Sequence, residues 1–176
     1  MTSPTIIFDD RRPIKPTVAF MLSHPAHIIA LGFGSGLASK VPGTIGSLWA
    51  WASWLLIQHH LSPPEQAVVI AFAFSVGWLA CTLTAQHMGI SDPGSIVWDE
   101  VIAMWLIFYL IMPTSFFEQL CAFALFRFFD AVKPGPVAWA DQLFKGFGWK
   151  GGFGIIWDDL VAAFCTLLTM ALWRFV

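Results

Sequence analysis

Two short stretches of this chain are near-copies of each other, and each begins a strongly apolar segment. Residues 96–103 read IVWDEVIA and residues 155–162 read IIWDDLVA. Both contain two β-branched residues, a Trp, two adjacent acids and an apolar run, and a glycine precedes each copy, at Gly94 and Gly154. Adjacent carboxylates repel each other, and burying them without partners costs several kcal/mol or raises their pKa. The fold therefore has to supply something that compensates four acidic side chains.

Helix capping is the simplest explanation for one acid pair, because Asp is a favoured N-cap and acids in a first turn are stabilised by the helix dipole. Capping needs only one side chain, however, and gives no reason for the flanking Ile/Val-Trp to recur. A divalent cation would relieve the repulsion and the burial cost of both pairs, and an oxygen-rich ligand set suits Mg²⁺ or Ca²⁺. The repeat therefore favours a metal site that uses both acid pairs: Asp99, Glu100, Asp158 and Asp159.

The apolar content of the chain indicates where these segments reside. Hydrophobic residues make up 57% of the sequence and charged residues 11%, against about 25% charged in ordinary soluble domains. We therefore predict an all-α fold, a polytopic membrane helical bundle with about five spans plus an N-terminal interfacial helix. The net charge of −2 gives no electrostatic footprint for nucleic-acid binding.

The charge distribution supports one topology. We predict a cytosolic N-terminal arm over residues 1–16 and a single membrane-embedded catalytic domain over residues 17–176, whose residues 17–31 lie at the interface. Spans are expected at about 44–57, 66–86, 99–111, 116–129 and 158–173. Every Lys and Arg except Arg174 then lies on the cytosolic side, as the positive-inside rule requires. The same topology places both acid pairs on that face.

Two further segments bring phosphate-binding groups to the same face. Residues 32–47 contain five glycines, small hydroxyls and Lys40, so backbone N–H groups there can approach a phosphate. This segment lacks the Gly-Lys-Ser/Thr of a P-loop, and a flexible turn or close helix packing is the alternative explanation. Residues 126–136 add Arg127, Asp130 and Lys133, and for the two cations snorkelling at lipid headgroups is the alternative.

Four segments in this order, residues 40–47, 92–100, 126–136 and 151–159, resemble the phosphatidylglycerophosphatase A family. The resemblance extends over most of the chain, with no departure at the motif positions. It implies a Mg²⁺-dependent lipid phosphatase of phospholipid biosynthesis, which converts phosphatidylglycerophosphate to phosphatidylglycerol. It also implies a multi-pass protein of the bacterial inner (cytoplasmic) membrane with its active site on the cytosolic face. Its partners would be the membrane phospholipid substrate and the lipid bilayer.

The residues and the resemblance together give each candidate a predicted role. Metal binding, with Mg²⁺ as the cofactor, is assigned to Asp99, Glu100, Asp130, Asp158 and Asp159. Catalysis is assigned to Asp99, Asp130, Lys133 and Asp158. Binding of the substrate phosphate is assigned to Lys40, Thr44, Ser47 and Arg127. Metal-activated water is the favoured mechanism, and a carboxylate acting as general base or nucleophile is left open.

Two other functions fit parts of the pattern. A CDP-alcohol phosphotransferase also uses carboxylates and Mg²⁺ at this boundary, but its Asp-Gly…Ala-Arg…Gly…Asp…Asp run is absent from the sequence. A small divalent-cation transporter would need a carboxylate near the middle of a span, and the expected spans have none there. The three cysteines form no CxxC pair and no zinc spacing, so the sequence does not favour zinc binding.

Overall fold

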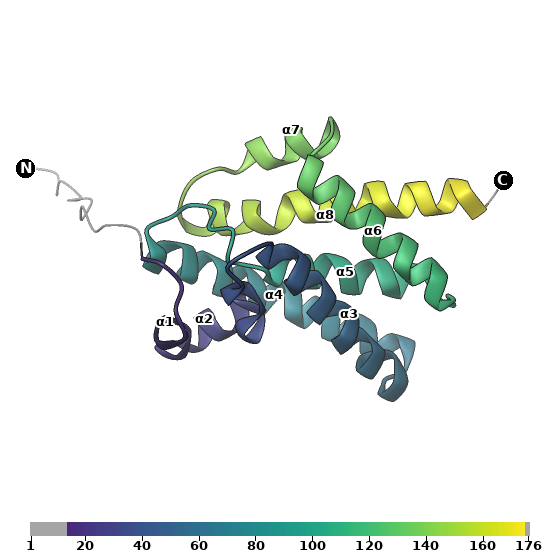
Figure 1. The fold of residues 1–176 in the computed structure, drawn as a ribbon, viewed down its shortest axis with the longest axis horizontal. Helices are drawn as coiled ribbons and strands as arrows, with labels where there is room; N and C mark the ends of the chain where they lie inside the picture. Colours follow the sequence, from purple (N-terminus) through teal and green to yellow (C-terminus); the bar gives the residue numbers. More distant parts are fainter. Residues whose placement is uncertain (1–13, 175–176) are drawn as a thin grey trace, which may run out of the picture.

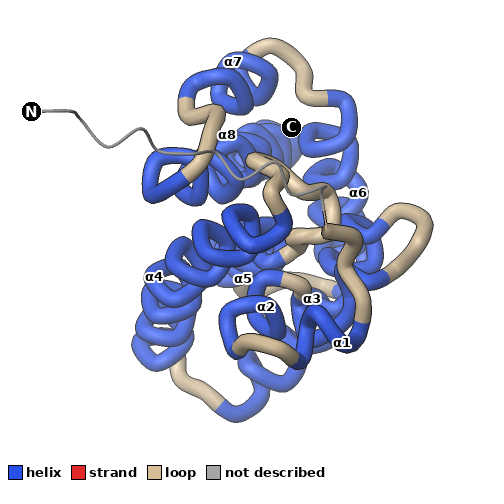
Figure 2. Tube along the Cα trace, turned by 90° about the vertical axis from the view of Figure 1, so that its left-hand side faces the viewer, coloured by secondary structure: helices blue, strands red, loops and turns tan. Residues whose placement is uncertain are grey.

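A computed structural model describes residues 14–174 of the chain, and these residues form helices and no strands (Figure 1; Figure 2). The elements in chain order are α1 (Val18–Leu22), α2 (Pro25–Ala30), the 3₁₀ helix η1 (Gly32–Leu37), α3 (Pro42–His60), α4 (Pro63–Met88), α5 (Trp98–Ile111), α6 (Phe116–Val132), α7 (Pro136–Leu143) and α8 (Gly148–Arg174). The predicted all-α class is confirmed. Most of the predicted arm over residues 1–16 lies outside the described residues.

Two helices are long and apolar enough to cross a membrane, α4 with 26 residues and α8 with 27. A straight crossing needs about 20 residues, whereas α5 has 14 and α6 has 17. Helix length and hydropathy therefore support a membrane protein but do not confirm the predicted five spans. The predicted interfacial helix over residues 17–31 is two short helices, α1 and α2.

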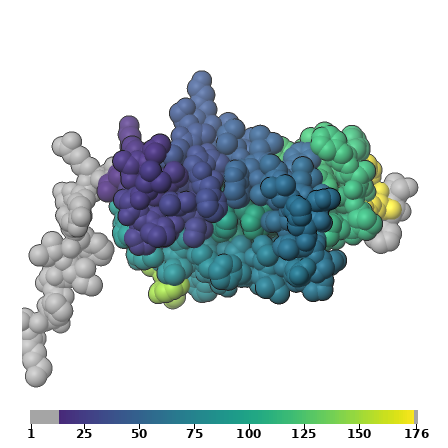
Figure 3. Space-filling model, turned by 90° about the horizontal axis from the view of Figure 1, so that it is seen from below, coloured from purple at the N-terminus to yellow at the C-terminus, as the bar shows by residue number. Residues whose placement is uncertain are grey.

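The outer surface of the bundle is apolar where α3 and α4 form it. These two helices make up much of the face seen in Figure 3. Their exposed large side chains include Leu48, Leu55, Leu56, Val68 and Phe72. Exposed apolar side chains of this size suit contact with lipid chains.

Helix α5 lies inside the bundle and packs against α3, α4, α6 and α8. Its tryptophans fix its position, because Trp98 Nε1 donates to the Ala73 carbonyl of α4 at 3.0 Å and Trp105 Nε1 donates to the Ala50 carbonyl of α3 at 3.0 Å. Buried indole N–H groups need such partners. Helix α5 is therefore held by α4 at its start, beside the first acid pair, and by α3 further along.

Helix α8 begins earlier than the sequence predicts, and this changes the setting of the second acid pair. The apolar segment was expected to start at Asp158 after a polar loop, but α8 begins at Gly148, and that loop contains α7. Glycines lower helix propensity, which is why this stretch has the composition of a loop. Packing explains them, because a Cβ on Gly152 would overlap the Thr82 side chain of α4.

Candidate metal and phosphate site

Helix α5 presents the first acid pair in its first turn, at Asp99 and Glu100. The N-cap residue Val97 makes no side-chain capping hydrogen bond, and its backbone N–H donates to the Ala30 carbonyl of α2 at 3.0 Å. Glu100 is buried and Asp99 is half-buried. The segment that leads into α5 is thus anchored on α2, and the two acids point from the helix start into the protein.

Helix α8 presents the second pair well inside the helix, at Asp158 and Asp159. Both side chains are buried, with 7% and 3% of their surface exposed. The favourable effect of a helix dipole on an acid falls off within the first turn, and α8 has no acid in its first turn. Capping therefore does not stabilise this pair, and the compensation must come from neighbouring elements.

Three carboxylates from the two pairs meet in one cluster formed by Asp99, Glu100 and Asp159. One oxygen from each lies within 4.8 Å of the others. Glu100 Oε2 and Asp159 Oδ2 are buried and have no hydrogen-bond partner among the described residues. Buried polar atoms without partners are costly, and carboxylate oxygens are the ligands that Mg²⁺, Ca²⁺ and Mn²⁺ prefer. The cluster therefore fits a divalent cation.

Arg127 on α6 braces one side of this cluster. Its Nη1 donates to Asp130 Oδ2 at 2.6 Å and lies 3.7 Å from Glu100 Oε1 and 3.4 Å from Ser47 Oγ. Gly43, in the first turn of α3, makes room for these groups, because a Cβ there would overlap Glu100 Oε1 and come within 3.1 Å of the guanidinium. Arg127 thus links α6 to the cluster and neutralises part of its charge.

Lys133 braces the other side, from the C-cap of α6. Its Nζ lies 2.5 Å from Asp158 Oδ2 of α8 and 2.5 Å from Asp141 Oδ1 of α7. Partial burial alone would lower the pKa of Lys133, but the hydrogen bonds to these two carboxylates outweigh burial and raise the pKa above its ordinary value. Lys133 therefore stays positively charged beside the cluster at neutral pH.

A polar cavity of about 220 Å³ joins these groups. Its wall includes all five predicted metal ligands, together with Lys133 and Asp92. The cavity thus brings the two acid pairs and the segment over residues 126–136 together. Within the predicted ligand set, Asp130 and Asp158 are each hydrogen-bonded to a cation, whereas Asp99, Glu100 and Asp159 form the compact cluster.

The predicted phosphate-binding residues are not among those that line the cavity. Lys40 is exposed and Thr44 is half-buried, both near the start of α3. The buried Ser47 hydroxyl donates to the Gly43 carbonyl at 2.8 Å. Arg127 is engaged with carboxylates. The cation that lines the cavity is Lys133, which the sequence assigned to catalysis.

Sequence reasoning missed two acids at the site. Asp92 lines the cavity and falls in the segment over residues 92–100 that carries the family resemblance, so a signal for it existed. Asp141 binds Lys133 but lies in a stretch that looked like a loop. Only the fold of α7 against α8 brings it to Lys133, and no local pattern indicates that contact.

Comparisons with known proteins agree with these motifs. A family model described as phosphatidylglycerophosphatase A matches residues 28–174. Phosphatidylglycerophosphatase A of Escherichia coli K12 is 42% identical over 142 residues, covering 80% of this chain and 78% of the relative. The protein of that name in Haemophilus influenzae is 37% identical over 156 residues, covering 89% of this chain and 93% of the relative.

A third relative carries a different name. The putative phosphatidylinositol-3-phosphatase of Bacteroides thetaiotaomicron is 32% identical over 157 residues, covering 85% of this chain and 93% of the relative. No solved structure matches the chain. The names of all three relatives describe phosphatases of phosphorylated phospholipids. The region that the family model matches, residues 28–174, contains the whole polar cavity.

Proposed function

The chain belongs to the phosphatidylglycerophosphatase A family, and from this membership we propose that it hydrolyses the phosphomonoester of phosphatidylglycerophosphate. The products are phosphatidylglycerol and phosphate, and the reaction serves phospholipid biosynthesis. The observation that carries the proposal is the cluster of Asp99, Glu100 and Asp159 in a polar cavity that also exposes Lys133. Such a cavity offers both a cation site and a fixed positive charge for a phosphate group.

Mg²⁺ is the cofactor in this proposal, and the carboxylates of Asp99, Glu100 and Asp159 would hold it. Asp130 and Asp158 also line the cavity but are paired with Arg127 and Lys133. When bound, a divalent cation supplies positive charge to phosphoryl oxygens and lowers the pKa of water. The two orphaned carboxylate oxygens, on Glu100 and Asp159, support this assignment.

The residues of the chain itself bind and orient the phosphate. An ammonium group has three N–H donors, and Lys133 uses two of them on Asp141 and Asp158. The third donor is available to a phosphate oxygen, and a charge-assisted hydrogen bond of this kind is among the stronger ones. Arg127 keeps Asp130 and Glu100 in place. Lys40 and Thr44, at the entrance to α3, stay proposed contacts for the lipid headgroup.

The location of the site in the membrane is part of the proposal. We place the protein in the bacterial inner membrane as a multi-pass protein, with the cavity on the cytosolic side. The apolar helices α4 and α8 and the one-sided distribution of Lys and Arg support this arrangement. A cysteine introduced at Lys150 should resist an impermeant thiol reagent in intact cells, and labelling there would overturn the topology.

The function is tested by measuring phosphate release in detergent, with Mg²⁺ and with a chelator. Phosphatidylglycerophosphate should be hydrolysed in Mg²⁺ and spared in the chelator. Phosphatidylinositol 3-phosphate is the comparison substrate, because one relative is named for it. Full activity in the chelator would remove the metal from the mechanism. Faster hydrolysis of the inositol lipid would replace the proposed substrate.

A further inference from the structure

We propose that Asp141 and Lys145 are positioning residues, which hold the Lys133 ammonium in the orientation that a substrate phosphate needs. This inference rests on the proposed phosphatase function, in which Lys133 contacts the phosphate. Neither residue lines the polar cavity of about 220 Å³, and neither follows from the motifs in the sequence. Their role would be exerted through Lys133.

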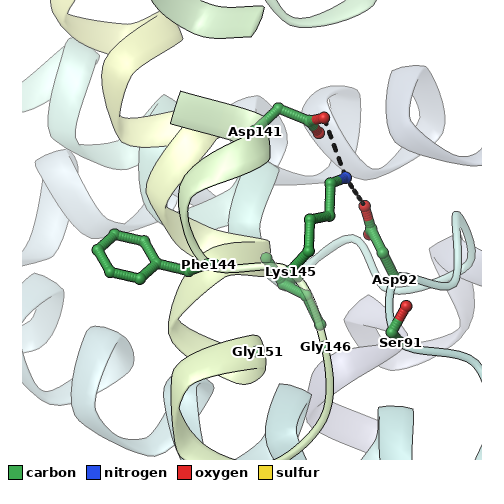
Figure 4. Close-up of a pocket in the computed structure, with 9 residues that line it drawn as sticks. Ser91, Asp92, Asp141, Phe144, Lys145, Gly146 and Gly151 are labelled. Atoms are coloured by element: carbon green, nitrogen blue, oxygen red, sulfur yellow. Dashed lines mark hydrogen bonds and ion pairs between the residues drawn. The ribbon is translucent and has the colours of Figure 1, made fainter. Parts of the chain in front are cut away.

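The geometry behind the proposal is a chain of five alternating charges, Asp158, Lys133, Asp141, Lys145 and Asp92. Lys133 Nζ lies 2.5 Å from both Asp158 Oδ2 and Asp141 Oδ1. The other oxygen of Asp141, Oδ2, lies 3.0 Å from Lys145 Nζ, which in turn lies 3.5 Å from Asp92 Oδ2. Figure 4 shows Lys145 between the two carboxylates that it bridges. Each oxygen of Asp141 thus serves a different ammonium group.

The row of alternating charges holds the Lys133 ammonium from two different helices. Asp158 approaches the ammonium from α8, and Asp141 approaches it from α7. A free Lys side chain has many rotamers, and ordering it costs conformational entropy. Because both carboxylates engage the ammonium before any substrate arrives, that cost is not incurred during binding, and the remaining N–H donor is available at the cavity.

Lys145 gives the arrangement its charge balance. With Asp158 and Asp141 alone, the Lys133 group would carry a net negative charge and would repel an incoming phosphate. Adding Lys145 offsets one of these negative charges: the set of Asp158, Lys133, Asp141 and Lys145 is balanced, and with Asp92 all five groups have one net negative charge where they would have two without Lys145. The more exposed pair of Lys145 with Asp92 is looser, so Lys145 acts mainly on Asp141.

A double-mutant cycle tests the positioning role with the full-length protein in detergent, using phosphatidylglycerophosphate and Mg²⁺. Asp141→Ala should lower kcat about 10- to 100-fold, as is typical when a residue that holds a metal ligand in place is removed, with a smaller change in KM. In a Lys133→Ala background the same substitution should cause no further loss, because no ammonium is left to position. Equal losses in both backgrounds would overturn the proposal, and so would full activity of Asp141→Ala.

A binding version of the cycle covers the case in which Lys133→Ala has too little turnover to measure. Inorganic phosphate with Mg²⁺ should raise the thermal unfolding midpoint of the wild type. Asp141→Ala and Lys133→Ala should each reduce this shift, and the double variant should reduce it no further than Lys133→Ala. Additive reductions would contradict the proposal.

Three variants separate positioning from general effects. Asp141→Glu keeps the carboxylate and should recover part of the lost kcat, whereas Lys145→Met should cause a smaller loss than Asp141→Ala. Lys150→Met is the matched control, since Lys150 is exposed and forms no ion pair among the described residues. It should retain full activity, and a loss equal to that of Lys145→Met would reduce the Lys145 effect to nonspecific surface charge.

A wild type that hydrolyses no lipid phosphomonoester would refute the proposed function, whereas an active wild type with an additive cycle would refute the positioning role alone.

Discussion

The two acid pairs share a sequence pattern but occupy different positions in their helices. Asp99 and Glu100 lie in the first turn of α5, whereas Asp158 and Asp159 lie in the interior of α8. The helix dipole stabilises acids only near the helix start, so it can act on the first pair and not on the second. Both pairs nevertheless line the same cavity. Helix stabilisation explains at most one copy of the pattern, while ligand binding accounts for both.

The second pair also divides its carboxylates between two tasks. Successive residues of an α-helix point about 100° apart, so neighbours on α8 face different partners. Asp159 joins the cluster with Asp99 and Glu100, and Asp158 binds Lys133. The comparison therefore predicts that two adjacent, similar acids have different functional effects.

Asp159→Asn should have the largest effect, because it removes a charge from the proposed cation site while keeping the shape of the side chain. Turnover of phosphatidylglycerophosphate should fall by at least on the order of 10²–10³, and more Mg²⁺ should be needed for half-maximal activity. Phosphate release measured across a Mg²⁺ titration checks both effects. An unchanged titration curve would remove Asp159 from the cation site.

Asp158→Asn should have the next largest effect, through Lys133. Asparagine keeps an oxygen that can accept from the ammonium but loses the charge, so kcat should fall by about 10- to 100-fold. The Mg²⁺ concentration for half-maximal activity should stay near the wild-type value. A shift as large as that of Asp159→Asn would show that both acids contribute to the cation site and would contradict their different roles.

Thermal stability in a chelator should also distinguish the two acid pairs, but here the substitutions should stabilise the protein although they lower its activity. Without a cation, the buried carboxylates repel each other, so Asp159→Asn should raise the thermal unfolding midpoint in detergent with chelator. Asp99→Asn should raise it less, since the dipole of α5 stabilises a charge at that position by about 0.3–1 kcal/mol. A lower midpoint for Asp159→Asn would mean that the cluster is not strained without metal.

The glycines that precede the two copies give the smallest and most local contrast. A Cβ on Gly154 would lie 2.5 Å from the Phe144 carbonyl oxygen, a backbone atom, whereas a Cβ on Gly94 would have nothing within 4 Å. Gly154→Ala should therefore destabilise the protein by about 1–3 kcal/mol, and Gly94→Ala should change stability by less than about 0.5 kcal/mol. Denaturant unfolding in detergent provides the comparison, and equal effects would show that α8 does not need close approach at Gly154.

The sequence predicts the all-α class and the convergence of the acid pairs, because both follow from periodic features: apolar segments, a repeated motif and one-sided charge. It does not predict that α8 starts at Gly148, since glycines indicate a loop until the packing of Gly152 on Thr82 is known. The split between Asp158 and Asp159 depends on how α8 is rotated relative to α6, which no local pattern encodes. Asp141 is invisible for the same reason, since its role requires α7 to pack beside Lys133.

Direct cation binding is the measurement that tests the central claim, that Asp159 and not Asp158 completes a cation site with Asp99 and Glu100. Mn²⁺ is a suitable probe because carboxylate sites that hold Mg²⁺ also bind it, and its free concentration can be followed by electron paramagnetic resonance. The wild type and Asp158→Asn should bind Mn²⁺ with similar affinity, and Asp159→Asn should bind it far more weakly. Undiminished binding by Asp159→Asn, or loss of binding in Asp158→Asn alone, would contradict this account of the site.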